Sequence, residues 1–436
     1  MKKHILLALS VLLLAFACEK SEETEQSSVL KNQNSALIQS WISLHLKVIK
    51  NTSGVTHVAY SRHFAYTGVA LYEALVLGDK QYKSIAGSLN GAIQLPQAPQ
   101  GKPLYWPASA NAAMAEMLRF FYPAKPENLQ RIDSLEQSWF DKYSSEVKSS
   151  TDLTAAVQFG KQVAQAVIEW SKQDGADAAA LPYTVLGEGH WEPTPPAFAP
   201  ANVPGWGNNR TILSGSITNT IPAAPIPFSA NAGTPFYQMA KEVYDVSQSL
   251  TEEQKAIAKF WDDAPNGQYV TAFGHWFSIL NQVLENDKPG LMKAADAYLR
   301  LGISMHDAAI SCWKTKYTYH LLRPVTYIRK YMGFDTWNAF ISTPPHPEYS
   351  AAHATLSAAA GYALQSVFGS NHAFTDHTYD VIGMSPRNFS SFEAAGTEAG
   401  ISRLYGGIHY RPSIETGNTQ GKQVGTNVKK LLVTRK

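Results

Sequence analysis

Helical spacing of apolar residues is the feature that most limits what this chain can fold into. Apolar side chains recur every three to four positions in many segments, whereas the strict alternation that marks a half-buried strand is scarce. Pro324 must end or kink the longest of these segments. We therefore expect an all-α fold, with helices over 35–50, 57–77, 108–121, 150–172, 251–262, 273–285, 289–331, 351–368, 391–405 and 415–432.

The stretch 178–235 has no clear periodicity and is rich in proline, glycine and tryptophan. Loops this long are usually functional or disordered. Its aromatic residues Trp191, Phe198 and Trp206 favour packing against the helices. We therefore expect this stretch to cover the entrance of a functional site.

Composition favours one large domain. With 44% hydrophobic residues, the 436-residue chain can bury a large core, and a net charge of +2 argues against a general nucleic-acid binder. No Walker loop, no strand–GxGxxG–helix unit and no zinc-like cysteine cluster is visible in the sequence. Length alone would suggest two or three domains. The candidate site described below draws on segments across the C-terminal half, which favours a single domain over 35–436.

The N-terminus predicts export. Two lysines precede an apolar run over 5–17, which is shorter than the roughly 20 residues of a membrane span and fits a signal-peptide core. Cys18 follows this run as in a bacterial lipoprotein signal, and the residues after it are polar, as in a flexible tether. We expect a signal peptide at 1–17, and a lipidated cysteine with its tether at 18–34. The protein would lie at the cell envelope and contact the membrane only through Cys18; plain secretion is the alternative.

The sequence contains two cysteines, Cys18 and Cys312. If Cys18 is lipidated, no intramolecular disulfide can form. Cys312 stands beside Trp313 in an apolar helical context, so we expect a buried thiol.

Three segments near the C-terminus carry the candidate chemistry. They are Lys316-x6-Arg323-Pro324, then Pro347-Glu348-Tyr349-Ser350-Ala351-Ala352-His353, then Ser402-Arg403-x5-His409. Together they supply three fixed positive charges and two imidazoles. If these side chains converge, they would form a pocket for a tetrahedral oxyanion.

Local geometry favours convergence. Lys316 and Arg323 are seven residues apart, about two turns, so we expect them on one face of a helix. His353 falls in the first turn of the helix predicted from 351, with Ser350 as its N-cap, near free N–H groups that attract anions. The pair Gly406-Gly407 indicates a turn between Arg403 and His409.

Each segment alone would be weak evidence, because a Lys–Arg pair usually lies on a solvated helix face and a single histidine is usually only packed. Together they resemble the vanadium-dependent haloperoxidases and the related type 2 phosphatidic-acid phosphatases. The phosphatases are usually much shorter than this chain. Three further stretches resemble bacterial haloperoxidases: the residues GEGHWEPTPP at 187–196, Phe260-Trp261-Asp262-Asp263, and Gly274-His275-Trp276.

The resemblance implies a fold of two four-helix bundles and a bound vanadate. His409 would be the single protein ligand of vanadium, and His353 would be the acid–base residue beside the apical oxygen. Trp313 and His346 would wall a halide pocket, although simple packing for the first and a loop position without a role for the second are about equally compatible with the sequence. The vanadate oxygens would be held by Lys316, Arg323, the backbone N–H of Ala352, and Arg403.

Asp263 is a further candidate, since its carboxylate could pair with Arg403 and fix the guanidinium. The alternative, which the sequence slightly favours, is an aspartate that only ends a helix or begins a turn.

The chain departs from the family pattern at two places. The family usually has Pro-Ser-Gly-His where this chain has Ser350-Ala351-Ala352-His353. Ala351 removes a hydroxyl donor, and the methyl group of Ala352 crowds the anion. Many members also have an aspartate four residues after the ligand histidine, where this chain has Ser413. Loss of such a carboxylate weakens metal binding about 10–100-fold, so we expect weakened activity.

The favoured hypothesis is a vanadate-dependent haloperoxidase that oxidises bromide or iodide with hydrogen peroxide to hypohalous acid, which a small organic acceptor could consume. One alternative is an acid phosphatase with phosphate in the same pocket and a phosphohistidine at His409. The other is a non-catalytic surface lipoprotein, which the substitutions at Ala351, Ala352 and Ser413 motivate.

Overall fold

The chain folds almost entirely into helices, as predicted. In the computed structural model, residues 30, 33–99, 104–147, 150–264 and 267–436 are described. The predicted signal peptide and the Cys18 site lie outside them. The helices are α2 (Ala36–Lys50), α3 (Ala59–Glu73), α4 (Trp106–Phe121), α5 (Pro126–Glu146), α6 (Ser150–Ser171), α7 (Pro235–Gln248), α8 (Glu252–Phe260), α9 (Thr271–Asp287), α10 (Leu291–Tyr319), α11 (Pro324–Met332), α12 (Ala352–Phe368), α13 (Phe392–Tyr405) and α14 (Arg411–Leu431).

Two helices were not predicted, α5 and α7. Both begin with a proline, Pro126 or Pro235, whose fixed φ suits the first helical position. The few buried side chains of α5 leave a weak apolar stripe, which explains why its periodicity was missed. A two-stranded antiparallel hairpin, β1 (Phe374–Asp376) with β2 (Arg387–Phe389), is the one named sheet of the described residues.

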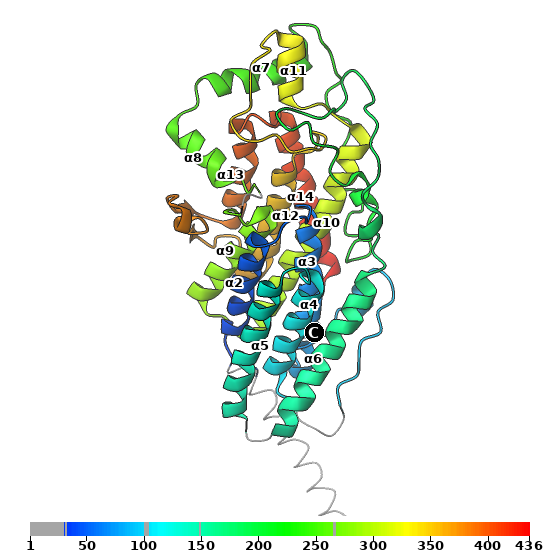
Figure 1. Cartoon of the computed structure of the whole chain (residues 1–436), viewed down its shortest axis with the longest axis vertical. Helices are drawn as coiled ribbons and strands as arrows, with labels where there is room; N and C mark the ends of the chain where they lie inside the picture. Colours follow the sequence, from blue (N-terminus) through cyan, green and yellow to red (C-terminus); the bar gives the residue numbers. More distant parts are fainter. Residues whose placement is uncertain (1–29, 31–32, 100–103, 148–149, 265–266) are drawn as a thin grey trace, which may run out of the picture.

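Eight of these helices form two groups of four (Figure 1). In the first group α4 packs against α3, α5 and α6, and in the second group α12 packs against α10, α13 and α14. The long helix α10 also packs along α3 and thereby joins the two groups. Among the described helices, none combines the length and apolar character that a membrane span requires.

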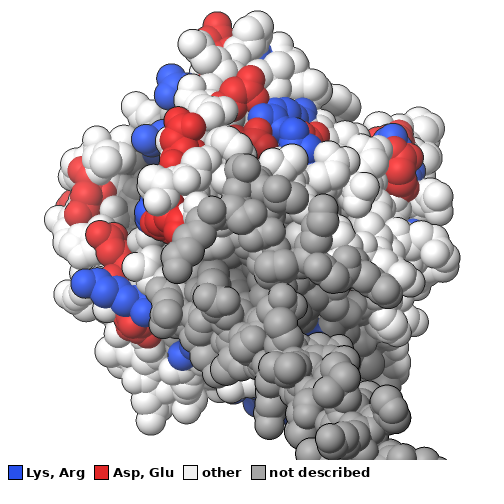
Figure 2. Space-filling view, turned by 90° about the horizontal axis from the view of Figure 1, so that it is seen from below, with Lys and Arg blue, Asp and Glu red and all other residues white. Residues whose placement is uncertain are grey.

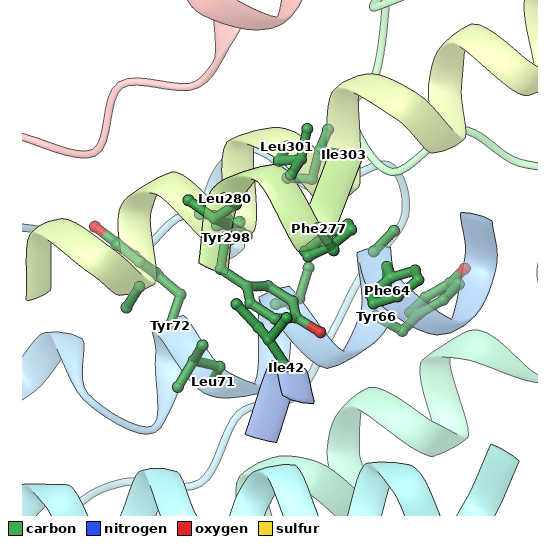
Figure 3. Close-up of a cluster of buried hydrophobic side chains, with 14 of the residues drawn as sticks. Ile42, Phe64, Tyr66, Leu71, Tyr72, Phe277, Leu280, Tyr298, Leu301 and Ile303 are labelled. Carbon is green, nitrogen blue, oxygen red and sulfur yellow. The ribbon is translucent and has the colours of Figure 1, made fainter. Parts of the chain in front are cut away.

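Aromatic side chains fill the region where α3, α9 and α10 meet (Figure 3). Phe64 stacks on Phe277 with ring centroids 3.9 Å apart, and Tyr298 packs against Phe277 at 4.7 Å. Cys312 is fully buried, as predicted. Acidic and basic side chains are interspersed over the described surface at the end of the molecule that Figure 2 shows.

Glycines set the close approach of α14 to α12. An added Cβ at Gly421 would lie 2.0 Å from the carbonyl oxygen of Thr355, and one at Gly417 would lie 2.7 Å from that of Ala351. Only glycine permits backbones to approach this closely. The contact holds the start of α12, and with it His353, against the helix that follows His409.

The irregular stretch 178–235 has no α-helix before Pro235, where α7 begins, in agreement with its sequence. It contains the 3₁₀ turn Pro204–Asn208, and Trp191 and Trp206 are buried as expected. Phe198, by contrast, is 63% exposed, so the prediction that it packs against the helices was wrong. Its φ of 46° places it in the left-handed region, which residues other than glycine rarely adopt.

Candidate active site

Lys316 and Arg323 do not share a helix face, contrary to our prediction. Helix α10 ends at Tyr319 because His320 adopts a left-handed conformation with φ 50°. Arg323 is the extended N-cap of α11, and Pro324 is the first residue of that helix. A residue before proline is pushed into extended backbone, which explains the break. Both side chains are nevertheless fully buried at the end of the second helix group.

His353 lies in the first turn of α12, as predicted, but the N-cap is Ala351 rather than Ser350. The Ser350 hydroxyl donates to Gln420 Oε1 at 2.5 Å and so faces away from the helix start. Arg403 stands in the last turn of α13. The predicted turn follows, with Gly407 at φ 77°, and it brings His409 back beside Arg323.

A cavity of about 380 Å³ joins most of the predicted site residues. Its wall includes both candidate histidines and both candidate halide-pocket residues. Lys316 and Arg323 are not part of the wall and lie directly behind it. The predicted residues that line the cavity are Asp263, Trp313, His346, Ala352, His353, Arg403 and His409.

The two buried cations behind the wall are held by backbone oxygens. Lys316 Nζ donates to the carbonyls of Pro347 (2.8 Å), Glu348 (2.9 Å) and Ser350 (2.6 Å). Arg323 donates from Nη1 to the Ile408 carbonyl at 2.9 Å, and the same nitrogen lies 3.2 Å from His409 Nε2. Lys316 thereby binds the segment before His353, and Arg323 binds the segment before His409.

Asp263 does not pair with Arg403, so the candidate pairing that the sequence offered is not formed. The Arg403 guanidinium donates to the carbonyl of Trp261 and to Ser402 Oγ. Asp263 instead accepts from His353 Nε2 at 3.3 Å and contacts His275 Nδ1 at 3.0 Å. The φ of Asp263 is 53°, in the left-handed region, a conformation that the sequence does not reveal.

A chain of alternating acids and histidines runs inward from His353. Beyond Asp263, His275 Nε2 contacts Asp376 Oδ2 at 2.8 Å, and the Tyr379 hydroxyl donates to Asp263. Burial alone would lower the pKa of His275, but the two carboxylates raise it to about 10. Sequence reasoning gave His275 no role and missed Asp376, which lies 101 residues further along in β1.

Part of the cavity wall is aromatic. Trp313 and His346 have ring centroids 5.1 Å apart, and the Trp313 indole donates to the Asn202 carbonyl at 3.4 Å. His57, which was missed, comes from the segment before α3 and contributes a buried Nε2 without a hydrogen-bond partner among the described residues. Asn202 belongs to the stretch 178–235, so one residue of that stretch lines the cavity. That the stretch covers the entrance of the site stays a prediction.

Glu348 is the most important residue that the sequence analysis passed over. Its carboxylate accepts from His409 Nδ1 at 2.8 Å, from the Tyr410 backbone N–H at 3.0 Å and from Ser413 Oγ at 2.6 Å. It stands inside the quoted segment Pro347–His353, but its reach to His409 depends on a contact between segments 61 residues apart.

Three basic side chains are buried at the site. None of Lys316, Arg323 and Arg403 forms an ion pair with a carboxylate among the residues described. Burial lowers the pKa of Lys316 to about 7 and that of both arginines to about 10. Unpaired buried cations are costly, and a bound oxyanion would relieve this cost. The donor set therefore fits an anion such as vanadate or phosphate.

Comparison with known proteins identifies the family. The structure matches a crystal structure described as the first bacterial vanadium-dependent iodoperoxidase, with a TM-score of 0.86 and 32% sequence identity over 93% of this chain and 98% of that one. The chain belongs to the vanadium-dependent haloperoxidase family. Residues 296–434 of this haloperoxidase also match the family model of the VCPO second helical-bundle domain. A search of curated protein sequences gives no match.

Two bacterial vanadium-dependent chloroperoxidase structures share the haloperoxidase fold. The holo form has a TM-score of 0.65 and 16% identity over 86% of this chain and 92% of that chain. The apo form has a TM-score of 0.64 and 15% identity over 87% of this chain and 95% of that chain. These identities support the fold alone. The predicted all-α haloperoxidase architecture is confirmed.

Proposed function

We propose that the protein is a vanadate-dependent peroxidase that oxidises a halide with hydrogen peroxide to hypohalous acid. The observation that carries the proposal is the group of three unpaired buried cations around one cavity that also contains His353 and His409. Oxyanion binding alone would need only the cations. The two histidines add a nitrogen ligand and a proton-transfer group, which a peroxidase of this family requires.

Four residues would hold the anion. Arg403 lines the cavity, while Lys316 and Arg323 supply positive charge from behind the wall. His409 Nε2 would be the ligand nitrogen, since Nδ1 is bound to Glu348. When bound there, vanadate activates hydrogen peroxide for attack by a halide without changing its oxidation state. The Ala352 methyl at the wall is a candidate cause of weakened anion binding.

His353 would accept and return the proton of hydrogen peroxide. Burial, followed by the charge of Arg403, lowers the pKa of His353 to about 4, so the ring is neutral at pH 7. Its Nε2 donates to Asp263, and its Nδ1 has no hydrogen-bond partner among the described residues. A neutral ring fixed in this way can take a proton from a bound peroxide.

We infer iodide as the first halide to test, with bromide second. The support is the 32% identity to a protein described as an iodoperoxidase. Iodide is large and easily oxidised, and the aromatic wall of Trp313 and His346 would contact such an ion. Any organic acceptor of the hypohalous acid would be a small molecule.

The deciding experiment titrates metal-free protein, purified without phosphate, with orthovanadate in the presence of hydrogen peroxide and iodide or bromide. We expect saturable, vanadate-dependent halide oxidation that disappears in His409→Ala. His377→Ala is the matched control, because His377 is an exposed histidine that does not line the cavity and forms an ion pair with Asp380.

The outcomes separate the remaining functions. Hydrolysis of phosphate esters that vanadate inhibits, without halide oxidation, would replace the proposal by an acid phosphatase with a phosphohistidine at His409. Failure of both reactions in protein that still binds vanadate would indicate a non-catalytic lipoprotein.

We also propose export and attachment to the cell envelope through a lipidated Cys18. The support is the sequence alone: the apolar run 5–17 and the cysteine that follows it. Labelling with a radioactive fatty acid should mark the wild-type protein and not Cys18→Ala. Equal labelling of both proteins, or release of wild-type protein into the medium, would contradict the anchor.

A further inference from the structure

The Glu348 carboxylate fixes the orientation of the His409 ring through a hydrogen bond to Nδ1. His409 Nδ1 lies 2.8 Å from Glu348 Oε1, and the ring is 2% exposed. Its other nitrogen, Nε2, is 3.2 Å from Arg323 Nη1, which can only donate. The ring therefore carries its proton on Nδ1 and keeps a lone pair on Nε2.

Glu348 is itself fixed at both ends. Its backbone N–H donates to the Leu321 carbonyl at 2.9 Å, and its own carbonyl accepts from Lys316 Nζ. Its carboxylate is fully buried and accepts two further hydrogen bonds, from the Tyr410 N–H to Oε1 and from Ser413 Oγ to Oε2. The Glu348 carboxylate thus accepts three hydrogen bonds from the segment 409–413.

We propose that Glu348 is the positioning residue of His409, held in place by Ser413, and that it does the work that the family usually assigns to an aspartate at position 413. The inference rests on the proposed function, because it concerns a ligand nitrogen. A histidine binds metal through an unprotonated nitrogen, and a hydrogen bond from its other nitrogen to a carboxylate fixes the tautomer and the ring plane. Ser413 then does not mark the loss of a carboxylate beside His409, because it holds Glu348, which supplies that carboxylate from another segment.

A second role for Glu348 has to be separated from the first. Its negative charge also interacts with Lys316 and Arg323, and the three groups affect one another's ionisation. If Glu348 only balanced these cations, its removal would strengthen the binding of every oxyanion. If it positions His409, its removal would weaken vanadate, which bonds to Nε2, and would spare phosphate, which needs the cations alone.

The experiment compares the full-length protein with Glu348→Ala, Glu348→Gln and Ser413→Ala. Vanadate and inorganic phosphate affinities are measured by calorimetry. The ring ¹⁵N spectrum is also recorded, with the His409 signals assigned by their absence in His409→Ala. We expect Glu348→Ala to lower vanadate affinity about 10–100-fold, with phosphate affinity unchanged or raised and the His409 ring no longer held as the Nδ1–H tautomer. Glu348→Gln keeps an acceptor for Nδ1–H and should lose less.

A rescue variant makes the test specific. In Glu348→Ala combined with Ser413→Asp, a carboxylate returns at the position that the family usually uses, so vanadate affinity and the Nδ1–H signal should recover in part. Loss of both oxyanions together in Glu348→Ala, or a wild-type ring without the Nδ1–H tautomer, would overturn the inference. The tautomer is read without turnover, so a protein that oxidises no halide would refute the proposed function and leave this inference standing.

Discussion

Asp263 and His275 are in direct contact, with 3.0 Å between Oδ1 and Nδ1, and the same carboxylate accepts from His353 through Oδ2. Burial alone would raise the pKa of Asp263, but His275 and then His353 hold it well below its usual range. Asp263 therefore stays ionised. Asp263 favours the protonated form of His353, but burial and then the charge of Arg403 outweigh it and keep the pKa of that ring at about 4.

Replacing His275 should destabilise the protein in a pH-dependent way. The raised pKa of His275 means that its stabilising contribution is complete below pH 6.5, its ordinary pKa, and is lost as the pH rises through about 10. We expect His275→Gln to cost about 3–5 kcal/mol near pH 6, since it leaves two buried carboxylates without their partner. The cost should shrink toward pH 10. Urea unfolding at both pH values measures it.

The matched control is His377→Gln, which breaks an exposed histidine–aspartate pair with Asp380. Exposed pairs contribute little, so this change should be nearly neutral at either pH. A pH-independent loss in His275→Gln would show that the ring is neutral and only packed.

Gly421→Ala should separate the start of α12 from α14. The added methyl group would lie 2.0 Å from the Thr355 carbonyl oxygen, which is backbone and cannot move aside alone. Overpacking of this kind costs about 1–3 kcal/mol, and occasionally more. We expect a lower Tm and a larger KM for peroxide, because His353 lies in the first turn of α12. Gly87→Ala, where an added Cβ meets nothing within 4 Å, should leave both unchanged.

Oxyanions should stabilise the folded protein through Arg403. A ligand at 100 times its Kd adds about 2.7 kcal/mol to the free energy of unfolding, so saturating vanadate or phosphate should raise Tm by several degrees. Arg403→Gln should remove most of this increase. In Arg119→Gln, which changes a cation paired with Glu116 and Asp133 on the first helix group, the increase should persist. An equal increase in the two variants would place the anion elsewhere.

Trp313→Phe should change halide use and leave anion binding intact. The indole lines the cavity and donates to the Asn202 carbonyl. A lost contact of about 1.4 kcal/mol corresponds to a tenfold higher KM for iodide. Tyr317→Phe is the control, since Tyr317 donates to the same Asn202 carbonyl at 3.0 Å without lining the cavity. Equal effects of the two variants would assign Trp313 to packing alone.

Local patterns predicted the helices well, because apolar spacing and prolines act over a few residues. The ends of α10 and α12 were harder to predict. Helix α10 ends where His320 adopts a left-handed conformation, which a histidine does not predict as a glycine would. The start of α12 at Ala351 depends on a hydrogen bond from the Ala351 N–H to the Ser413 carbonyl, which lies far along the chain. The motif identified the site residues on the three C-terminal segments. It did not predict how these side chains are arranged relative to one another.

Partners separated widely along the chain could not be predicted. Glu348 was quoted within a motif, but its contact with His409 depends on the turn at Gly407. Asp376 reaches His275 only because the β1–β2 hairpin packs beside α9. His57 enters from the N-terminal half. In each case tertiary packing, rather than any local preference, brings the atoms together.

The shared helix α10 has a consequence for how the protein can be divided. The family match covers residues 296–434, yet the cavity also needs His57 and Asp263, which precede that region. A fragment that begins at α10 would therefore retain all three cations and His409, and would lack the carboxylate that holds His353. Under the proposed function, such a fragment would keep the groups that hold an oxyanion, and it would lack the carboxylate that fixes the proton-transfer ring of His353. The residues before α10 would then contribute to proton transfer rather than to anion binding.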